Sequence, residues 1–149
     1  RVIAPDPTFN SVLLTKFINM VMERGKKTIA QSIVYGALDI LVEKKEGDAN
    51  KLFEQVMEAA RPAVEVRSRR VGGANYQVPM PVTVDRQNAL AFRWMIAAAK
   101  ARKGQNMVNK LASEMMDILE GVGGTMKKKD DVHRMAEANK AFAHFARRR

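Results

Sequence analysis

The 149-residue chain contains no cysteine, so it can form neither a disulfide framework nor a zinc site built on thiolates. The longest unbroken apolar run, residues 94–99, is far too short to span a membrane. The opening residues 1–5 lack the apolar stretch of a secretory signal peptide. The lack of cysteine suits a protein of a reducing compartment. The chain length favours one domain, residues 1–149, with a hydrophobic core of its own.

Acidic residues are fewer than basic ones. The chain has 16 acidic and 26 basic residues, which gives a net charge of +10. The excess is uneven along the chain. Residues 1–60 carry eight basic and eight acidic groups, whereas residues 61–103 carry nine basic and only two acidic groups. Residues 104–149 carry nine basic and six acidic groups. Solubility alone does not require clustered charge, so the excess around residues 61–103 predicts a surface that binds a polyanion.

This basic segment has the period of two that is typical of strands. Polar and apolar residues alternate over residues 64–69, and the alternation resumes after Gly72-Gly73. The pattern predicts a β-hairpin over about residues 64–84, because a glycine pair supplies the positive φ of a tight turn. A phosphate-binding loop is the weaker interpretation, since no Gly-Lys-Ser/Thr sequence follows and no helix begins there. The apolar residues of the second strand are Tyr76, Val78, Met80, Val82 and Val84.

Two prolines and three arginines indicate that this hairpin has an open edge and a positively charged surface. Pro79 and Pro81 share a parity, so both missing N–H groups can face one open edge, as in a two-stranded ribbon. Arg67, Arg69 and Arg70 cluster beside the turn. An isolated ribbon is only marginally stable in water, and we therefore expect contact with an anionic partner to stabilise this one.

The rest of the chain has the periodicity of helices. Asn10 or Ser11 is placed to cap a first helix that Gly25 ends, and Asp85 is placed to cap a fourth. We predict a mainly α fold, a bundle of about six helices with a protruding two-stranded β-hairpin. The expected helices cover about residues 11–25, 28–43, 49–61, 85–102 and 108–120, and a sixth starts between Thr125 and Asp131. The expected inward-facing residues are Leu13, Phe17, Met20, Val21, Val34, Leu38, Leu41, Val42, Phe53, Val56, Met57, Ala60, Leu90, Trp94, Ala98, Val108, Leu111, Ala112, Met115, Leu119, Val132, Met135, Ala136 and Phe142.

No residue pattern typical of catalysis or metal binding is present. His133 and His144 would lie ~16 Å apart on one helix, too far to share a metal, and His133 is better placed to pair with Glu137 at the surface. Adjacent Asp130 and Asp131 diverge on a helix, so they suit its first turn rather than acid–base chemistry. No serine, lysine or carboxylate lies in a nucleophile motif. We therefore expect a protein that is not an enzyme and uses no cofactor or metal.

Two aromatic residues are candidates for stacking on a nucleic-acid base. Trp94 lies on an apolar helical stripe, where burial in the core is the favoured role. Tyr76 lies within the arginine-rich hairpin and is the better candidate.

Two long blocks, residues 61–79 and 131–144, resemble the signature sequences of the family of small-subunit ribosomal protein seven, of bacterial or organellar type. Pro5-Asp6-Pro7 and Gly25-Lys26-Lys27 also match that family. The resemblance implies a helical core with a protruding ribbon that binds the 3′ major domain of small-subunit rRNA and nucleates head assembly. It places the ribbon near the exit-site tRNA and the mRNA path, with neighbouring ribosomal proteins of the head and platform as partners. The location would be a cytoplasmic, chloroplast or mitochondrial ribosome.

The resemblance and the charge excess together indicate the RNA-binding residues. At positions that match the family motifs, the resemblance implies roles for Lys26, Lys27, Arg67, Arg69, Arg70, Tyr76, His133, Arg134 and Lys140. The further predicted RNA-binding residues are Arg86, Arg93, Arg102, Lys103, Lys127, Lys128 and Lys129. The residues expected near tRNA or mRNA are Gly72, Gly73, Arg147, Arg148 and Arg149. Residues 81–85 depart from the family pattern, which usually has another arginine there, so Thr83 is given no phosphate role.

Two other functions remain open at this point. An architectural DNA-binding protein can use a β-ribbon arm in a groove, but such arms usually carry an apolar wedge where this chain has Gly72-Gly73. An RNA-modifying enzyme would need a cofactor loop or an acid–base pair, and the sequence offers neither. A ribosomal protein that neutralises RNA phosphates with lysine and arginine is the interpretation that we prefer.

Overall fold

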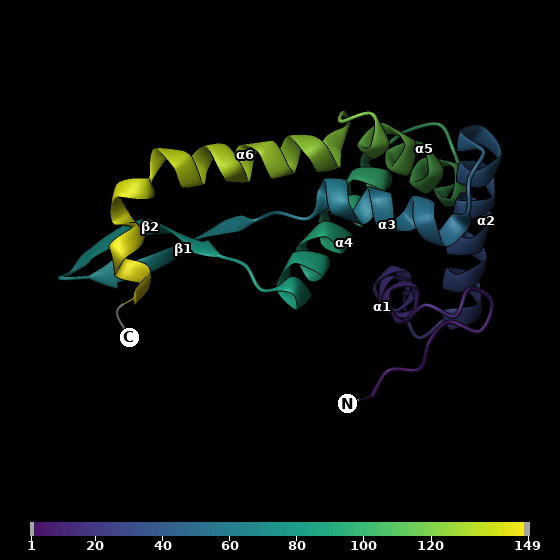
Figure 1. The fold of residues 1–149 in the computed structure, drawn as a ribbon, viewed down its shortest axis with the longest axis horizontal. Helices are drawn as coiled ribbons and strands as arrows, with labels where there is room; N and C mark the ends of the chain where they lie inside the picture. The colour runs from purple at the N-terminus through teal and green to yellow at the C-terminus, as the bar shows by residue number, and fades with distance from the viewer. Residues whose placement is uncertain (1, 148–149) are drawn as a thin grey trace.

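The computed structural model describes the backbone of residues 2–147 and the side chains of residues 2–144. Within these residues, six α-helices, one two-stranded antiparallel sheet and a C-terminal 3₁₀ segment follow one another along the chain (Figure 1). The mainly α prediction is therefore confirmed. The elements are α1 (Val12–Val21), α2 (Lys27–Lys45), α3 (Ala49–Ala60), β1 (Val64–Val71), β2 (Ala74–Pro81), α4 (Val84–Ala101), α5 (Met107–Leu119), α6 (Gly124–Ala138) and η1 (Lys140–Arg147).

Polar side chains cap the N-termini of three helices. The Ser11 Oγ accepts a hydrogen bond from the Leu14 N–H at 3.1 Å, which confirms Ser11 as the cap of α1. Asp48 caps α3 in the same way, and Asn106 caps α5. In each case the side chain satisfies an N–H group that the first turn of a helix leaves without a partner.

The main hydrophobic core is drawn entirely from α1–α5, which we call the helical body. At its centre the ring of Phe17 lies 5.4 Å from that of Phe53 and 5.0 Å from that of Phe92. The expected stripe of α3 faces this core, because Phe53, Val56, Met57 and Ala60 are all buried. Trp94 is buried as predicted, but it lies outside the main core with Val78, Leu90 and Ala136.

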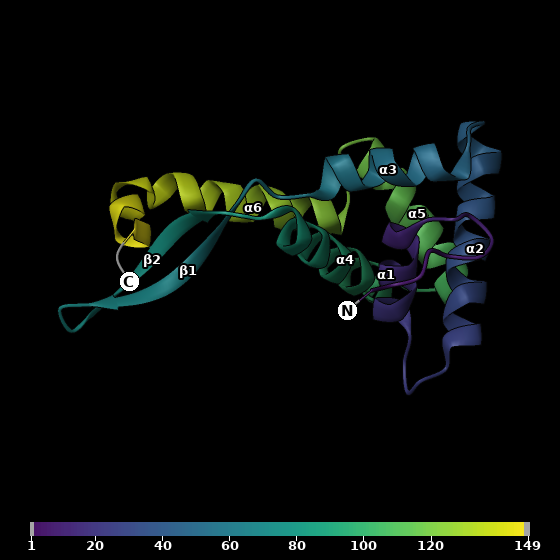
Figure 2. The same cartoon turned by 60° about the horizontal axis from the view of Figure 1, so that its bottom comes forward.

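The ribbon, residues 64–81, extends away from the helical body, and α6 runs beside it (Figures 1 and 2). Gly72 and Gly73 form its turn with φ of 58° and 85°, as the hairpin prediction requires. A two-residue turn fixes which opposed pairs exchange hydrogen bonds, and every second pair from the turn does not. Pro79 opposite Val66 and Pro81 opposite Val64 fall at such pairs, so no ladder hydrogen bond is lost.

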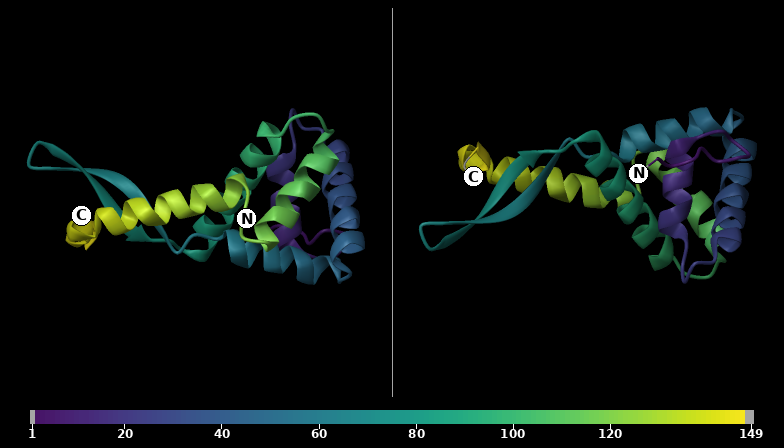
Figure 3. Two further views of the ribbon diagram at one scale, coloured as in Figure 1. Left: turned by 90° about the horizontal axis from the view of Figure 1, so that it is seen from above. Right: turned by 90° about the horizontal axis from the view of Figure 1, so that it is seen from below.

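Views from above and below show the helical body at one end of the molecule and the ribbon with η1 at the other (Figure 3). Helix α6 connects the two ends, because it starts beside α5 and finishes beside β2. The molecule is therefore elongated, with the ribbon as an arm.

Several predicted boundaries are wrong. The second strand ends at Pro81 rather than near residue 84, and Val84 already belongs to α4. Thr83, with extended backbone, is the cap of α4, so Asp85 lies inside the first turn. Its carboxylate still meets the positive end of the helix there, which explains why it resembled a cap.

Glycines misled the prediction of where helices end. Helix α1 ends at Val21, and Gly25 lies in the following corner with φ of 73°. Helix α6 begins at Gly124, earlier than expected, so Asp130 and Asp131 lie beyond its first turn. Phe142 belongs to η1 rather than to α6.

Two methionines expected in the core are exposed instead. Met20 in α1 and Met135 in α6 lie at the edge of an apolar stripe, where periodicity cannot distinguish the rim from the centre.

Candidate nucleic-acid interface

The ribbon carries arginines on both faces. Directly opposed residues of an antiparallel pair share a face, and Arg67 lies opposite Val78 while Arg69 lies opposite Tyr76. Arg70, one residue further along, therefore points to the other face. Arg67 and Arg70 are exposed and Arg69 is half-buried. The three arginines lie close together along the strand, but they do not form one patch.

The tip of the ribbon is open. Gly72 and Gly73 are exposed, and a Cβ atom added to either would meet no other group within 4 Å. Such a bare backbone can approach a flat or narrow partner closely. The role predicted for these glycines near tRNA or mRNA stays a prediction.

Tyr76 packs against the C-terminal segment. Its ring centroid lies 5.0 Å from that of Phe142 in η1, at an interplanar angle of 49°. The contact brings η1 against β2. The Tyr76 face turned to Phe142 is not available to a base, so the proposed stacking role would need the other face. The side chain of Arg147, and Arg148 and Arg149 entirely, lie outside the described residues.

The base of the ribbon contains an ion pair. The Arg86 guanidinium of α4 donates two hydrogen bonds to the Glu65 carboxylate of β1, each at 3.3 Å. Arg67 approaches the same carboxylate at 3.4 Å. Burial acts to raise the pKa of Glu65, but the hydrogen bonds and charges of Arg86 and Arg67 more than offset it and hold that pKa below its usual value. The charge of Arg86 is thus paired with a carboxylate of the protein itself.

Helix α6 holds the other side of the base. The Ala63 N–H donates to Nε2 of His133 at 3.2 Å, and Lys129 Nζ donates to the carbonyl oxygen of Ala59 at 2.7 Å. Since Nε2 accepts, the His133 ring is neutral with its proton on Nδ1. Burial, with help from the charge of Lys129 and against the opposing effect of Asp130, lowers the pKa of His133. The predicted surface pair of His133 with Glu137 is wrong, because Glu137 pairs with Lys140 instead.

Arg102 faces inward as well. Its guanidinium contacts Glu114 at 3.0 Å and also bonds Asp117. Glu114 is only 1% exposed, and its second oxygen accepts the Thr125 N–H at 3.0 Å. The cation compensates a buried carboxylate that helps to join α4, α5 and the start of α6. The RNA-binding role predicted for Arg102 remains untested, but its geometry indicates a structural role.

The remaining predicted residues lie on the surface. Arg134 pairs with Asp131 at 3.2 Å and Lys140 with Glu137 at 2.9 Å, and such exposed pairs contribute little to stability. Seven other side chains are exposed and form no hydrogen bond or ion pair with any described residue. They are Lys26, Lys27, Arg70, Arg93, Lys103, Lys127 and Lys128.

A family profile described as ribosomal protein S7p/S5e matches residues 1–140. The chain belongs to this family. Small ribosomal subunit protein uS7 of Desulfotalea psychrophila is 57% identical over 146 residues, covering 97% of this chain and 93% of that protein. The proteins of the same name from Alcanivorax borkumensis and Chloroflexus aggregans are 57% and 54% identical over 145 and 147 residues. They cover 97% and 99% of this chain, and 93% and 94% of their own lengths.

Membership of the S7p/S5e family confirms the resemblance and makes the chain a structural ribosomal protein, not an enzyme. It gives no support to the alternative of an architectural DNA-binding protein. No helix of the described residues is both long and apolar enough to cross a membrane.

Sequence reasoning missed two cations beside the Lys26 corner. Arg24 and Lys100 line a cavity of about 410 Å³ whose walls include Ile29 and Met107. Lys100 contacts Glu23 at 2.8 Å, and its hydrogen bond and charge lower the pKa of that carboxyl. The signal for Arg24 was its place directly before the Gly-Lys-Lys motif, whereas nothing in the sequence indicated that Lys100 lies near it.

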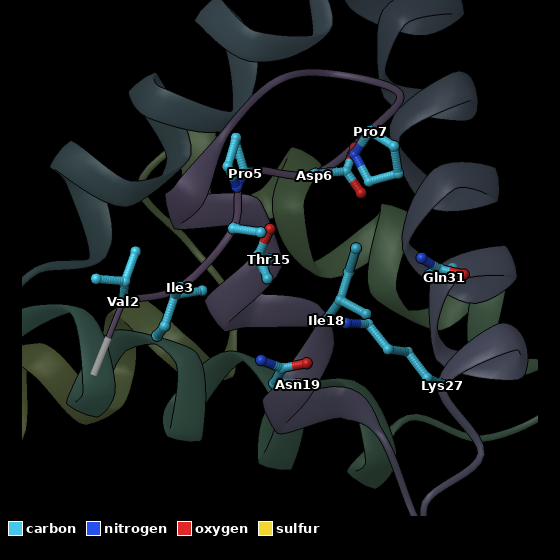
Figure 4. Close-up of a pocket in the computed structure, with 11 residues that line it drawn as sticks. Val2, Ile3, Pro5, Asp6, Pro7, Thr15, Ile18, Asn19, Lys27 and Gln31 are labelled. Atoms are coloured by element: carbon cyan, nitrogen blue, oxygen red, sulfur yellow. The ribbon is translucent and has the colours of Figure 1, made fainter.

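A larger cavity, about 620 Å³, lies between the N-terminal segment, α1 and α2 (Figure 4). Asp6 forms part of its wall, but the Asp6 carboxylate already accepts hydrogen bonds from the Tyr35 hydroxyl and from the N–H groups of Thr8 and Phe9. Lys27 lies on the opposite side of the cavity in Figure 4. The Asp6 carboxylate therefore helps to hold the N-terminal segment in its fold.

Proposed function

We propose that this chain is a constituent of the small ribosomal subunit that binds the 3′ major domain of its rRNA and nucleates assembly of the head. The observation that carries the proposal is the set of seven exposed cations that bond to no other described residue, in a chain of net charge +10 whose relatives are named small ribosomal subunit protein uS7. Cations without internal partners are free to replace the counterions of RNA phosphates.

The structure favours a division of labour among the predicted residues. Lys26, Lys27, Arg93 and Lys103 on the helical body, Arg70 on the ribbon, and the α6 pair Lys127 and Lys128 are the proposed phosphate contacts. Arg86, Arg102, Lys129 and His133 are bonded inside the protein and support the shape that presents those contacts.

The finer part of the proposal concerns the ribbon. Its exposed Gly72-Gly73 tip lies far along an arm that projects from the helical body (Figure 1), as a group reaching toward the exit-site tRNA and the mRNA path would. Head and platform ribosomal proteins are the proposed protein neighbours. The ribosome can be cytoplasmic or organellar under this proposal.

Binding to RNA fragments across a salt series tests the proposal. We expect tight binding to a 3′ major domain fragment of small-subunit rRNA, and weaker binding to duplex DNA and to a fragment of another rRNA domain. The double variant Lys127→Gln, Lys128→Gln should flatten the dependence of log K on log salt by roughly 0.7–0.9 for each lost phosphate contact. Lys44→Gln, which changes an exposed lysine within residues 1–60, the segment with no net charge, is the control. Equal affinity for all three nucleic acids would overturn the proposal.

A further inference from the structure

Only two short links join the ribbon to the helical body. Residues 61–63 connect α3 to β1, and residues 82–83 connect β2 to α4. The two links are tied to each other by a hydrogen bond from the Val82 N–H to the Ala63 carbonyl oxygen at 3.3 Å. This hydrogen bond fixes the spacing of the two links, which together we call the hinge, and the ribbon beyond them packs against α6 and η1.

One fastener lies on the α4 side of this hinge. Glu65 is the second residue of β1, and both of its carboxylate oxygens accept from Arg86 in the first turn of α4. The Glu65 side chain is 12% exposed and that of Arg86 is 36% exposed, so water is partly excluded from the pair. Two hydrogen bonds from one guanidinium to the two oxygens of one carboxylate also restrict how the two groups are oriented, which a single lysine contact would not.

The other fastener lies on the α6 side, and Figure 1 shows the base of the ribbon between α4 and α6. Nε2 of His133 accepts from the Ala63 N–H within the first link, at 3.2 Å. Lys129, one turn earlier on α6, bonds the Ala59 carbonyl oxygen at 2.7 Å and anchors the helix at the end of α3. Helix α6 is therefore attached to both sides of the point where the chain leaves the helical body.

We propose that the Glu65–Arg86 pair and the Ala63–His133 hydrogen bond form a two-sided clasp that sets the angle between the ribbon and the helical body. Arg86 and His133 are then positioning residues, which act on RNA through the ribbon and do not contact it. The effect on RNA binding rests on the proposed function, whereas the effect on the angle of the ribbon does not.

A clasp of this kind favours binding. Fasteners on opposite sides of a hinge resist bending in both directions, so the ribbon reaches its partner already in place. An arm held in its bound orientation loses less conformational freedom on binding than a swinging one does. Both fasteners are polar contacts, and hydrogen bonds depend on direction as well as on distance.

Electron-spin distance measurements on the free protein test the angle. Because the chain has no cysteine, Ala74→Cys near the tip and Lys51→Cys on α3 provide two unique label sites, both exposed. Adding Glu65→Gln and His133→Ala should broaden the distance distribution at least about twofold. His133→Gln, which keeps an acceptor, and the reversed pair Glu65→Arg with Arg86→Glu should each restore a narrow distribution. Lys44→Gln, which changes an exposed lysine of α2, is the control and should leave both the distance distribution and RNA binding unchanged.

Binding of the same variants to the 3′ major domain fragment separates positioning from contact. The clasp predicts that Glu65→Gln with His133→Ala weakens binding and leaves the salt slope unchanged, and that the reversed pair binds like the parent. A slope lowered by roughly 0.7–0.9 in the reversed pair would show instead that Arg86 touches a phosphate, which overturns its positioning role. If Glu65→Gln with His133→Ala leaves the distance distribution as narrow as that of the parent, the clasp itself is overturned. Failure of the parent to bind rRNA would overturn the proposed function alone, since the distances are measured without RNA.

Discussion

Arg102 and Glu114 form the ion pair that joins the end of α4 to α5, with the Glu114 carboxylate 1% exposed and 3.0 Å from the guanidinium. The same carboxylate accepts the Thr125 N–H near the start of α6. Gly123, with φ of 95°, makes this approach possible, because an added Cβ would lie 2.9 Å from Asp117 and 3.3 Å from Glu114. One buried carboxylate thus joins the start of α6 to α5 and to the end of α4.

Removing the cation should therefore be costly. Arg102→Ala leaves the buried Glu114 carboxylate without its charge partner, and loss of one partner of a buried pair typically costs about 3–5 kcal/mol. Because Arg102 is partly exposed, we expect the lower end of that range in the free energy of unfolding measured with denaturant. Lys103→Ala, the exposed neighbour, should be nearly neutral. Equal effects of the two changes would contradict the structural role of Arg102.

A second prediction concerns how much the aromatic residues at the centre of the helical body contribute to stability. Phe53→Ala removes a ring that is packed against Phe17 and should lower the free energy of unfolding by about 3–5 kcal/mol. Lys51→Ala, on the exposed face of the same helix, should leave it almost unchanged. Thermal or denaturant unfolding of both variants is the measurement, and similar midpoints would contradict the burial of the α3 stripe.

His133 predicts a pH dependence of stability. Its pKa is lowered in the folded protein, so at pH values between that folded pKa and about 6.5 the unfolded chain binds more protons. The contribution of His133 to stability is therefore fully present above about pH 7 and is lost as the pH falls below about 6.5. Denaturant unfolding of the parent and of His133→Gln across this range measures it. The variant should lose part of the slope, and identical slopes would contradict the neutral, accepting ring.

A shortened ribbon should leave the helical body folded, because no residue of the ribbon belongs to the main core. Deleting residues 68–71 and 74–77 while keeping Gly72-Gly73 places the turn between Arg67 and Val78, an opposed pair of the same hydrogen-bonding type as Val71 and Ala74. Circular dichroism should show retained helicity and a cooperative melt, with weaker rRNA binding. A loss of cooperative melting would mean that the ribbon and its contact with Phe142 are needed for the whole fold.

The sequence was sufficient to predict the ribbon and the helices because their signals are local. The proline parity, the glycine pair and the Ser11 cap each depend on neighbours within a few residues, and the structure confirms all three. The internal ion pairs were not predicted. Glu65 and Arg86, or Arg102 and Glu114, meet only after the chain has folded back on itself. The sequence alone does not distinguish an arginine that neutralises a buried carboxylate from an arginine that is exposed and able to bind a phosphate.

Directed cleavage of RNA tests the central claim most directly. An iron chelate attached to Ala74→Cys, or in a second sample to Lys51→Cys, generates hydroxyl radicals at the ribbon tip or at the helical body of an otherwise cysteine-free chain. With intact small-subunit rRNA, we predict cuts confined to the 3′ major domain from both sites, at different nucleotides for each. Cuts scattered over all domains, or concentrated in another domain, would contradict a protein that binds the 3′ major domain of the small-subunit rRNA.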